Sequence, residues 1–401
     1  MTAFAGDEEA EVEVRHAAHG AGMPTIYDVA RLAGVSIATV SRVLNDRGNP
    51  RPETRDRVRQ AVTELGFVPN GAARALSVRL KAIAGVVVRR PSGPHVAGGW
   101  QPPGVWGATG VLGVDAFADE AETLQFQDML NRGIERAAQR RDFDLLVRSV
   151  GIADRDVSMR VLALARKSDG LILHDQVLDP DQLAWLSRLV PVVTVAATPT
   201  PTTVNVSSDN RAGMRALARH LLYDHGYRSF GYLAGYEGSP DSQARLEALS
   251  AETSAAGAAL VSGPRWRGNY CAAGAAVVTE ALLAAGTPLP RVIVSANDQT
   301  ALGVLYVLRR SGVSVPDEVA VTGFDDIPLA RHTEPRLTTV KQPVAEIGEI
   351  AFEALYGMIG RRQPPERDIV LPTRLVCRES CGCPSGTGVA KAAEGADPGC
   401  A

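Results

Sequence analysis

A short segment near the amino terminus combines one arginine with small apolar and hydroxyl side chains at helical spacing. Ile37, Ala38 and Arg42 would lie on the outward surface of a helix spanning residues 37 to 44. The Arg42 guanidinium can donate two hydrogen bonds to N7 and O6 of guanine, and Ile37 and Ala38 can contact thymine methyl groups. The nearby polar side chains, which suit phosphate oxygens, are Ser36, Thr39, Ser41 and Asn45. This pattern predicts a helix that reads base edges in the major groove.

Polar clusters follow three apolar runs further along the chain, where strands are expected to end. They are Ser208-Asp209-Asn210, Ala296-Asn297-Asp298 and Gly323-Phe324-Asp325-Asp326. Open parallel sheets bind ligands beyond the carboxyl ends of their strands. For Asn210 and Asp298, capping of the following helix is an equally good interpretation. The clusters therefore predict a polar ligand cleft.

The cysteines are sparse and odd in number, so no disulfide framework is expected. They are Cys271, Cys377, Cys381, Cys383 and Cys400. The group at 377, 381 and 383 could in principle hold a metal, but no fourth ligand lies near it in the sequence. We therefore expect free thiols and no metal.

Catalytic motifs are missing from the sequence. It holds no phosphate-loop glycine motif, no paired metal-ligand histidines and no nucleophile elbow, and its seven histidines are scattered. The prediction is a protein that is not an enzyme and carries no cofactor. No run of about 18 apolar residues and no secretory signal is present, which predicts a cytoplasmic protein without membrane contact.

Three short helices must position the arginine. Thr25 can cap a helix from Ile26 to Ala33, Gly34 ends it, and Ser36 can cap the second helix from Ile37 to Leu44. A third helix opens at Arg51-Pro52-Glu53. Their inward residues, expected to form a small core, are Ile26, Val29, Ala30, Ala33, Val40, Val43, Leu44, Val58, Ala61, Val62 and Leu65. The arrangement is typical of a helix-turn-helix unit.

Charge separates this unit from the rest of the chain. Residues 24 to 81 hold 10 Lys and Arg against 5 Asp and Glu, a net charge of +5, and since the whole chain is -3 the remainder is -8. A basic module on an acidic body favours phosphate binding, although a solvated helical surface has the same balance.

The segment TIYDVARLAGVSIATVSRVLN (25 to 45), with Thr54-Arg55 and GFVPN (66 to 70) after it, resembles the lactose-repressor (LacI/GalR) family. The resemblance runs from about Thr25 to Ser380 and implies that Ile37, Ala38 and Arg42 are the recognition-helix residues and that Thr25 belongs to the DNA-binding set. One departure is Pro50, where the family usually has valine. The resemblance implies a repressor that binds a palindromic DNA operator as a homodimer under the control of a small-molecule effector, expected to be a sugar.

An alanine-rich segment from Asn70 to Leu76 has helical propensity but is too short to be stable alone. The resemblance implies a hinge helix that folds on the operator, with Asn70, Ala73 and Leu76 at the DNA and Leu76 wedged into the minor groove. Packing of Leu76 against the core as a linker residue is the alternative.

From Ile83 onward, apolar runs alternate with amphipathic stretches, which predicts parallel sheets with helices on both faces. The predicted strands are 83–88, 144–150, 170–173, 192–195, 230–234, 292–295 and 319–322. The resemblance implies a periplasmic-binding-protein-like α/β core of two doubly wound lobes, with residues 82 to 225 and a return at 326 to 339 in the first lobe. It also implies effector contacts from Asp209, Arg245, Asn297 and Asp325, with Trp266 as a stacking surface.

The chain departs from the family after the first core strand, where Arg89-Arg90-Pro91 leads into about 30 extra residues rich in Gly and Pro. We expect an insertion at about 92–123, either a lid that presents Trp100 and Trp106 to the effector or a disordered surface loop. The predicted domains are a disordered acidic tail (1–23), the helix-turn-helix (24–69), the hinge (70–81), the core (82–379) and a disordered tail (380–401). Without leucine heptads in that tail, a dimer rather than a tetramer is expected.

Overall fold

The computed structural model describes residues 26–44, 51–65, 80–90, 125–151, 154–286, 288–360, 366–384 and 390–392. It divides into two compact units, residues 1–81 and 82–401. Several predictions lie outside the described residues: those for Thr25, Asn45, Asn70, Ala73, Leu76, the amino-terminal tail and the insertion at 92–123. Within the described ranges, no helix has the length and apolar character that a membrane crossing requires.

The first unit is a three-helix module composed of α2 (Ile26–Ala33), α3 (Ile37–Leu44) and α4 (Pro52–Leu65). Ser36 begins α3, and its hydroxyl accepts a hydrogen bond from the backbone amide of Thr39 at 3.2 Å, as a capping residue does. Every inward residue predicted from the sequence packs in one cluster, with Val29, Val40 and Val58 fully buried. This core holds α3 through Val40 and Val43, while Ile37, Ala38 and Arg42 of the same helix are exposed.

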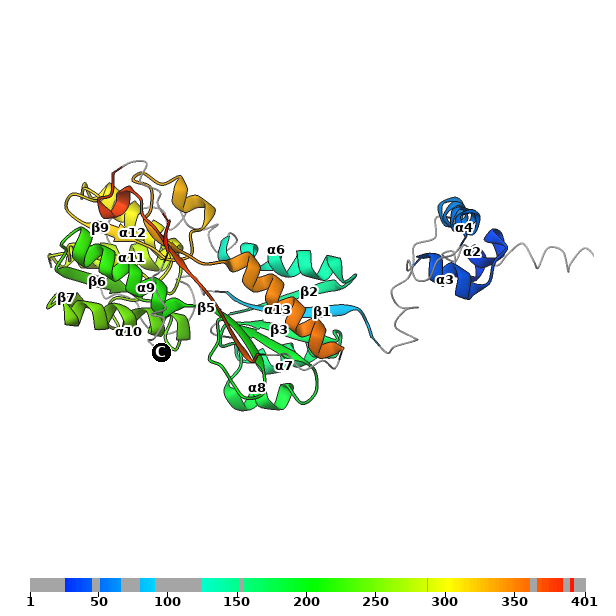
Figure 1. The fold of residues 1–401 in the computed structure, drawn as a ribbon. Coiled ribbons are helices and arrows are strands. Elements are labelled where there is room, and N and C mark those ends of the chain that lie inside the picture. Colours follow the sequence, from blue (N-terminus) through cyan, green and yellow to red (C-terminus); the bar gives the residue numbers. More distant parts are fainter. Residues whose placement is uncertain are drawn as a thin grey trace, which may run out of the picture. The chain divides into compact units, whose positions relative to one another are not determined.

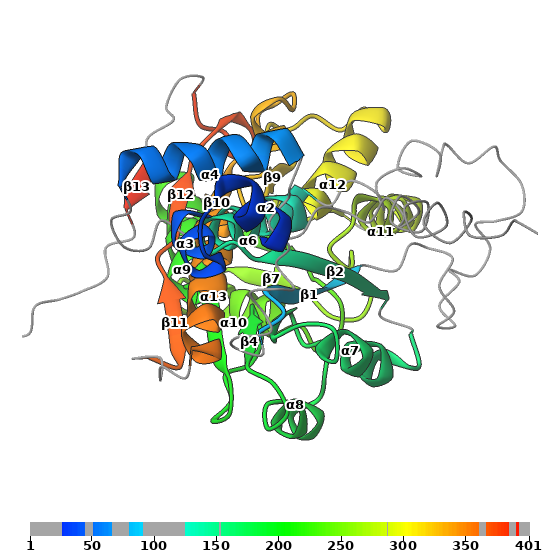
Figure 2. The same ribbon diagram turned by 90° about the vertical axis from the view of Figure 1, so that its right-hand side faces the viewer.

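The second unit contains a first lobe built on one parallel sheet, strand order β11-β5-β4-β3-β1-β2. The strands are β1 (Ile83–Arg90), β2 (Asp144–Gly151), β3 (Gly170–His174), β4 (Val192–Val195), β5 (Val204–Ser208) and β11 (Asp368–Leu371). Helices α6 (Gln125–Arg140) and α13 (Val344–Ile359) cover one face, and α7 (Val157–Ala165) and α8 (Pro180–Leu186) cover the other (Figure 1). The view turned by 90° again places α7 and α8 on the side opposite α13 (Figure 2).

A second lobe is built on the parallel sheet β7-β6-β8-β9. Its strands are β6 (Ser229–Leu233), β7 (Ala259–Val261), β8 (Val292–Ser295) and β9 (Ala320–Thr322), and its helices are α9 (Asn210–Arg219), α10 (Pro240–Ala255), α11 (Ala272–Ala284) and α12 (Asp298–Arg310). The π-helical turn η2 (His220–Asp224) continues α9, and a 3₁₀ turn η3 spans Pro328–Arg331. A small antiparallel sheet, β10 (Thr339–Lys341), β12 (Arg374–Val376) and β13 (Ala390–Ala392), lies beside α9.

The division between the lobes differs from the prediction. Helix α9 packs with Phe230 and Tyr232 in the second lobe, so the first lobe ends at Ser208 rather than at His225. The segment expected to return near 326–339 also belongs to the second lobe, where Ile327, Ala330 and Leu337 are buried against α12 and β9. The return to the first lobe consists of α13 and β11 instead. The chain thus crosses between the lobes after β5, after β10 and after β11.

The carboxyl-terminal boundary was also placed too early. Ser380 and Cys381 were expected in a disordered tail, but both are fully buried in the 3₁₀ turn η4 (Glu379–Cys381). The Ser380 hydroxyl donates to the carbonyl of Val321 at 2.6 Å and accepts from the amide of Thr338 at 2.8 Å. These bonds attach the end of the core to β9.

Candidate functional site

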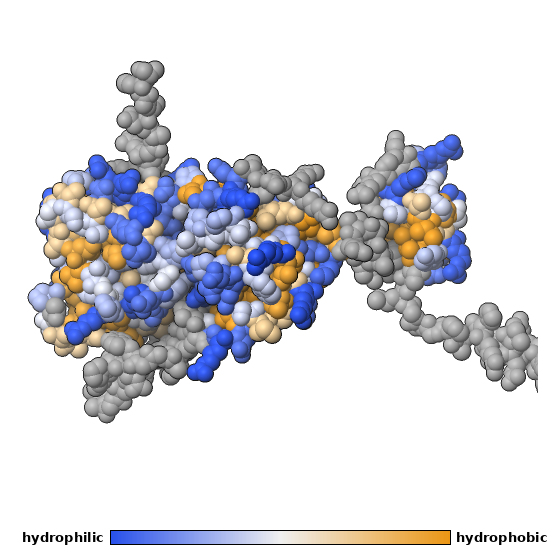
Figure 3. Space-filling view, turned by 90° about the horizontal axis from the view of Figure 1, so that it is seen from below, coloured by the Kyte–Doolittle hydropathy of each residue, from blue (hydrophilic) through white to orange (hydrophobic). Residues whose placement is uncertain are grey.

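The outward face of α3 carries the predicted base-reading residues. Ile37, Ala38 and Arg42 are exposed, while Val40 and Val43 of the same helix are buried. Apolar residues reach the surface of this unit (Figure 3), and Ile37 is 40% exposed although large apolar side chains are usually buried. The position therefore keeps an apolar group available for a partner.

Hydroxyl groups border this face. The Ser36 and Thr39 hydroxyls lie 2.9 Å apart, and Ser41 is half-buried on the same helix. Because the Ser36 and Thr39 hydroxyls lie at the amino-terminal end of α3, that end presents hydrogen-bonding groups to an anion such as a phosphate.

A cavity lies between the two lobes, at the carboxyl ends of strands from both parallel sheets. The space between its lining atoms measures about 610 Å³ when the part open to solvent is included. The first lobe contributes Arg89, Phe126, Gln127, His174, Asp175 and Ala196. The second lobe and the crossing strand contribute Tyr236, Ser239, Asp241, Arg245, Tyr270, Asn297, Gln299, Asp325 and Gln342. Both lobes and one crossing therefore meet at a single pocket.

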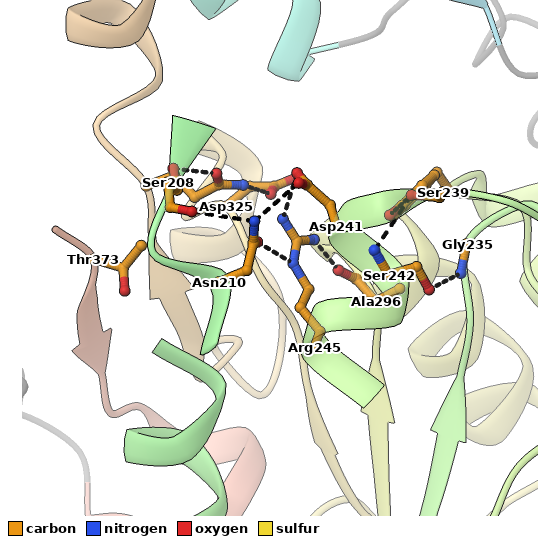
Figure 4. Close-up of polar contacts among 12 residues, drawn as sticks. Ser208, Asn210, Gly235, Ser239, Asp241, Ser242, Arg245, Ala296, Asp325 and Thr373 are labelled. Carbon is orange, nitrogen blue, oxygen red and sulfur yellow. Dashed lines mark hydrogen bonds and ion pairs between the residues drawn. The ribbon is translucent and has the colours of Figure 1, made fainter. Parts of the chain in front are cut away.

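Arg245 is the centre of the polar wall formed by the second lobe (Figure 4). It is 2% exposed, and its guanidinium donates to Asn210 Oδ1 at 2.7 Å and to the carbonyl of Ala296 at 2.5 Å. It also lies 3.3 Å from Asp241 Oδ2 and above the ring of Phe324. These contacts hold the cation rigid at the floor of the cavity.

Burial dominates the electrostatics of the cavity. It raises the pKa of Asp175 to about 7, with Arg89 opposing the shift. Burial also raises the pKa of Asp325, and it lowers the pKa of His174 to about 4, with Arg89 adding to that effect. Carboxyl groups with a pKa near neutrality can exchange a proton when a ligand replaces their surroundings.

Three buried polar atoms of the cavity wall have no hydrogen-bond partner among the described residues: Arg89 Nε, His174 Nδ1 and Tyr236 Oη. The Arg89 side chain does lie near Asp175, with Nε 3.8 Å from Oδ2, and donates a hydrogen bond to the Gln176 carbonyl through another nitrogen. A buried polar group without a partner costs about 1–3 kcal/mol. These atoms therefore point to a polar ligand that satisfies them.

The structure brings three of the predicted effector residues together, Arg245, Asn297 and Asp325, and all three line the cavity. Asn297 also caps α12 by accepting from the amide of Thr300 at 2.9 Å. Asp298, for which capping was an alternative, is instead fully buried and accepts hydrogen bonds from Thr339 and the Ile327 amide. Asn210, the other such residue, bonds Arg245 and Asp241.

Two predicted effector residues do not line the cavity. Asp209 is the capping residue of α9, where its side chain accepts from the amide of Ala212 at 2.8 Å. Trp266 is 7% exposed and packs with Leu233 and Ile293 in the core of the second lobe, over Gly231, where any β-carbon would meet its ring. The indole ring of Trp266 is thus part of the hydrophobic core and does not offer a stacking surface to the cavity.

Most residues of the cavity wall were not predicted from the sequence. Asp175 follows β3 as Asp325 follows β9, and Tyr236 follows β6. Asp325 was predicted, and the same rule, that ligand residues follow strand ends, could also have found Asp175 and Tyr236. Tyr270 and Gln342 follow no predicted strand, and their positions depend on how the loop before α11 and the crossing strand fold.

Two regions of the chain match known protein families. Residues 25–70 match the family described as bacterial regulatory proteins, lacI family, and residues 218–381 match a periplasmic binding protein-like domain. The HTH-type transcriptional regulator GalS of Salmonella typhimurium is 33% identical over 89% of this chain and 96% of its own length. The ribose operon repressor of Haemophilus influenzae is 28% identical over 89% and 98%.

Solved structures agree with this placement. The lac repressor dimer bound to operator and the anti-inducer ONPF has a TM-score of 0.70 at 24% identity and covers 90% of this chain and 99% of its own. The complex of the transcriptional regulator CelR with cellobiose has a TM-score of 0.60 at 27% identity, over 89% and 99%. The chain therefore belongs to the LacI family of DNA-binding transcriptional regulators.

Proposed function

We propose that this regulator is a repressor that binds a near-palindromic operator as a homodimer and that a sugar bound in the cavity between the lobes changes its operator affinity. The observation that carries the effector half of the proposal is the set of buried, unsatisfied polar atoms on the cavity wall, on Arg89, His174 and Tyr236. They come from both lobes, so one ligand that satisfies them favours a particular arrangement of the lobes.

The other lining residues support a sugar as ligand. Asp175, Asp241 and Asp325 accept hydrogen bonds from hydroxyl groups, while Arg245 and Asn297 donate them. The rings of Phe126, Tyr236 and Tyr270 offer apolar faces to the C–H surfaces of a sugar ring. One relative carries the name of a ribose operon repressor, and the related regulator CelR is in complex with cellobiose.

The DNA-binding part of the proposal depends on helix α3. We assign base contacts to Ile37, Ala38 and Arg42 and phosphate contacts to Ser36, Thr39 and Ser41, because the first group faces outward and the second borders the same face. Thr25, Asn45, Asn70, Ala73 and Leu76 stay predicted DNA contacts. Each protomer then reads one half-site, so a two-fold dimer requires a palindrome.

An edge of the first-lobe sheet that pairs with no other described strand supports the homodimer. Strand β2 is the last strand of the first-lobe sheet, and Leu146 and Val147 on it are 36% and 54% exposed. An edge strand with exposed apolar residues suits pairing with a second copy. Val147→Asp should therefore weaken the dimer, whereas Leu189→Asp, in the turn after α8 where the leucine is 54% exposed and belongs to no strand, should not. Sedimentation equilibrium of both variants checks this assignment.

A ligand panel tests the effector assignment. Purified full-length protein is titrated by calorimetry with mono- and disaccharides and, as a contrasting class, with purine bases. At 100 times its Kd, a ligand that binds only the folded state stabilises it by about 2.7 kcal/mol, which appears as a raised Tm. We expect a sugar to bind, to raise Tm and to be recovered chemically unchanged. Binding of a purine and of no sugar would overturn the assignment, and a hydrolysed or oxidised sugar would point to catalysis.

A further inference from the structure

A second cluster of side chains, outside the cavity, brings two histidines of the second lobe against the cysteines of the carboxyl-terminal segment. His220 and His225 belong to η2 and the residue after it, and Cys381 and Cys383 belong to η4 and the residues after it. One ligand atom from each of these four residues lies within 4.8 Å of every other. None of the four lines the cavity between the lobes.

Five distances among the four ligand atoms match edges of a metal tetrahedron, and the sixth, between the two sulfur atoms, is within 4.8 Å. Nε2 of His220 lies 3.6 Å from Sγ of Cys381 and 3.4 Å from Sγ of Cys383, and Nε2 of His225 lies 3.6 Å and 3.5 Å from the same two atoms. With Zn–S near 2.3 Å and Zn–N near 2.05 Å, tetrahedral geometry requires N···S edges of about 3.6 Å and an N···N edge of about 3.3 Å. The two Nε2 atoms are 3.1 Å apart.

Hydrogen bonding among the four groups does not account for this arrangement. Nδ1 of His220 lies 2.7 Å from Asp224 Oδ2, and a ring N–H donated there leaves Nε2 as an acceptor with a single lone pair. Yet Nε2 of His220 is surrounded by Cys377, Cys381, Cys383 and His225, all within 3.6 Å. One lone pair cannot accept from four neighbours, whereas one cation can be shared by several lone pairs.

The contact between His220 and Asp224 is also an arrangement that zinc sites contain. In zinc sites, a ligating histidine donates its other ring N–H to a carboxylate, which fixes the ring and raises the basicity of the ligating nitrogen. His220 and Asp224 have this arrangement, and the His220 side chain is 6% exposed while that of Asp224 is 47% exposed. The carboxylate therefore orients the ring from the solvent side.

Local backbone structure builds the cluster. The π turn joins the amide of His225 to the carbonyl of His220, five residues earlier, and so brings both rings to one side of the chain. Gly382 has φ +100°, and a β-carbon there would approach Tyr227 and His225. Since glycine adopts this conformation without strain, it allows Cys381 and Cys383 to turn toward the same point. The Tyr227 hydroxyl holds the turn through the Cys381 carbonyl at 2.8 Å.

From this geometry we infer that His220, His225, Cys381 and Cys383 form a structural zinc(II) site, with Asp224 as the carboxylate that orients His220. The donor set of two thiolates and two imidazoles is one that zinc prefers in closed, tetrahedral sites. Binding releases the thiol protons to solvent and involves no redox step. The expectation of free thiols overlooked the histidines because they lie more than 150 positions away in the sequence.

The position of the site suggests what the metal does. The first crossing from the first lobe leads into α9 and on to His220, and the last crossing leads through β12 to Cys381. A metal would tie these two returning segments together inside the second lobe. That link would keep the second lobe rigid while the crossings bend.

Metal analysis of the full-length protein tests the site. Protein purified under reducing conditions without chelator is expected to hold one zinc per chain by mass spectrometry of the native protein and by elemental analysis. Cobalt(II) in place of zinc should give the ligand-field bands of tetrahedral S/N coordination. Cys383→Ser and, separately, His225→Gln should lose both signals, whereas Cys271→Ser, which changes a thiol that caps α11 elsewhere in the second lobe, should keep them.

Two further readouts separate metal binding from folding. Asp224→Asn should bind zinc about 10- to 100-fold more weakly, the range typical for loss of a partner to a ligating histidine. Chelation should lower Tm in the wild type and in Cys271→Ser but leave Cys383→Ser unchanged. The inference is overturned if folded wild-type protein binds neither zinc nor cobalt, if cobalt bands are octahedral, or if Cys383→Ser and His225→Gln both retain the metal.

Discussion

The side-chain amide of Gln342 donates a 2.5 Å hydrogen bond to Oδ1 of Asp325. Its carbonyl oxygen accepts a second bond, at 2.6 Å, from the hydroxyl of Ser208 at the end of β5 in the first lobe. Asp325 lies in the second lobe and Gln342 on a crossing between the lobes, and both line the cavity. One side chain therefore joins the ligand cavity to both lobes at the point where they must bend.

Replacing this side chain should uncouple the cavity from the DNA. Gln342→Leu leaves Asp325 and Ser208 without their shared partner, so ligand binding should no longer select one lobe arrangement. Coupling between two sites is typically 1–3 kcal/mol, or about 5- to 150-fold in affinity. We measure the operator Kd with and without ligand by fluorescence anisotropy and expect the ratio of the two values to approach one.

Gln243→Leu, at an exposed glutamine on α10 that bonds Glu247, is the control and should keep the wild-type change in operator Kd. A Gln342→Leu protein that still binds its ligand and shows the full wild-type change would contradict the role assigned to this hydrogen-bond chain.

Two tyrosines separate ligand binding from stability. Tyr236→Phe removes a buried hydroxyl that has no partner among the described residues, so the ligand-free protein should keep its Tm, while ligand affinity should fall about 3- to 10-fold for a lost hydrogen bond. Tyr232→Phe removes a hydroxyl bonded to Ser242 at 3.0 Å away from the cavity. It should destabilise the fold by about 0.5–1.5 kcal/mol without changing affinity. Calorimetry and thermal unfolding of both variants give the comparison, and equal affinity of Tyr236→Phe and wild type would remove Tyr236 from the site.

The contribution of Asp175 to the free energy of unfolding should fall as pH rises. Its pKa in the folded protein, about 7, lies above the ordinary value of 3.8. Between these values the folded state binds more protons than the unfolded state, so this group stabilises the fold fully below pH 4 and loses that contribution as pH approaches 7. His174 acts in the opposite direction, because its lowered pKa of about 4 makes stability rise from about pH 4 to 6.5.

Asp175→Asn isolates the carboxyl contribution. The residue has φ +65°, a conformation that asparagine tolerates as aspartate does, and its oxygen can still accept from the Gln176 amide. The variant should become progressively more stable than wild type between pH 4 and 7, and the difference should level off above pH 7. Urea unfolding across that range measures it, and a difference that is independent of pH would show that Asp175 titrates normally.

Arg42 should specify one base pair rather than general affinity. Arg42→Ala should cost about 1–3 kcal/mol at the preferred operator and relax specificity at one position of each half-site. Thr39→Ala should weaken all sequences equally, because a phosphate contact carries no base information. Arg59→Ala, exposed on α4, is the control and should change neither quantity. Competition binding against single-base operator variants distinguishes these outcomes.

Local sequence signals predicted the helix-turn-helix unit well. Its core depends on apolar residues spaced along three short helices, and Val29, Val40 and Val58 lie where that spacing places them. Seven of the ten strands described in the two parallel sheets were predicted, among them β3, β4 and β8, which are apolar runs buried on both faces. The strands β5, β7 and β11 were not among the predicted ones. Apolar periodicity is therefore sufficient to predict a helix or strand when the spacing of its own apolar residues decides which side chains are buried.

Features that depend on contacts between residues distant in the sequence were not predicted. The lobe division was misjudged because nothing in the sequence of α9 indicates that it packs on β6 rather than on β5. Asp175 lines the cavity from a loop and has a positive φ angle, which residue propensity does not reveal. The encounter of His220 with Cys381 depends on the whole second lobe folding, so cysteine spacing alone suggested free thiols.

The most direct test of the central claim is selection of DNA from a random library by the purified full-length protein, repeated with the sugar that binds it. A near-palindromic sequence should be enriched, with two half-sites related by the symmetry of the dimer, and the sugar should abolish or strengthen that enrichment. If no sequence is enriched with or without the sugar, the claim that this chain is an effector-controlled operator-binding repressor is contradicted.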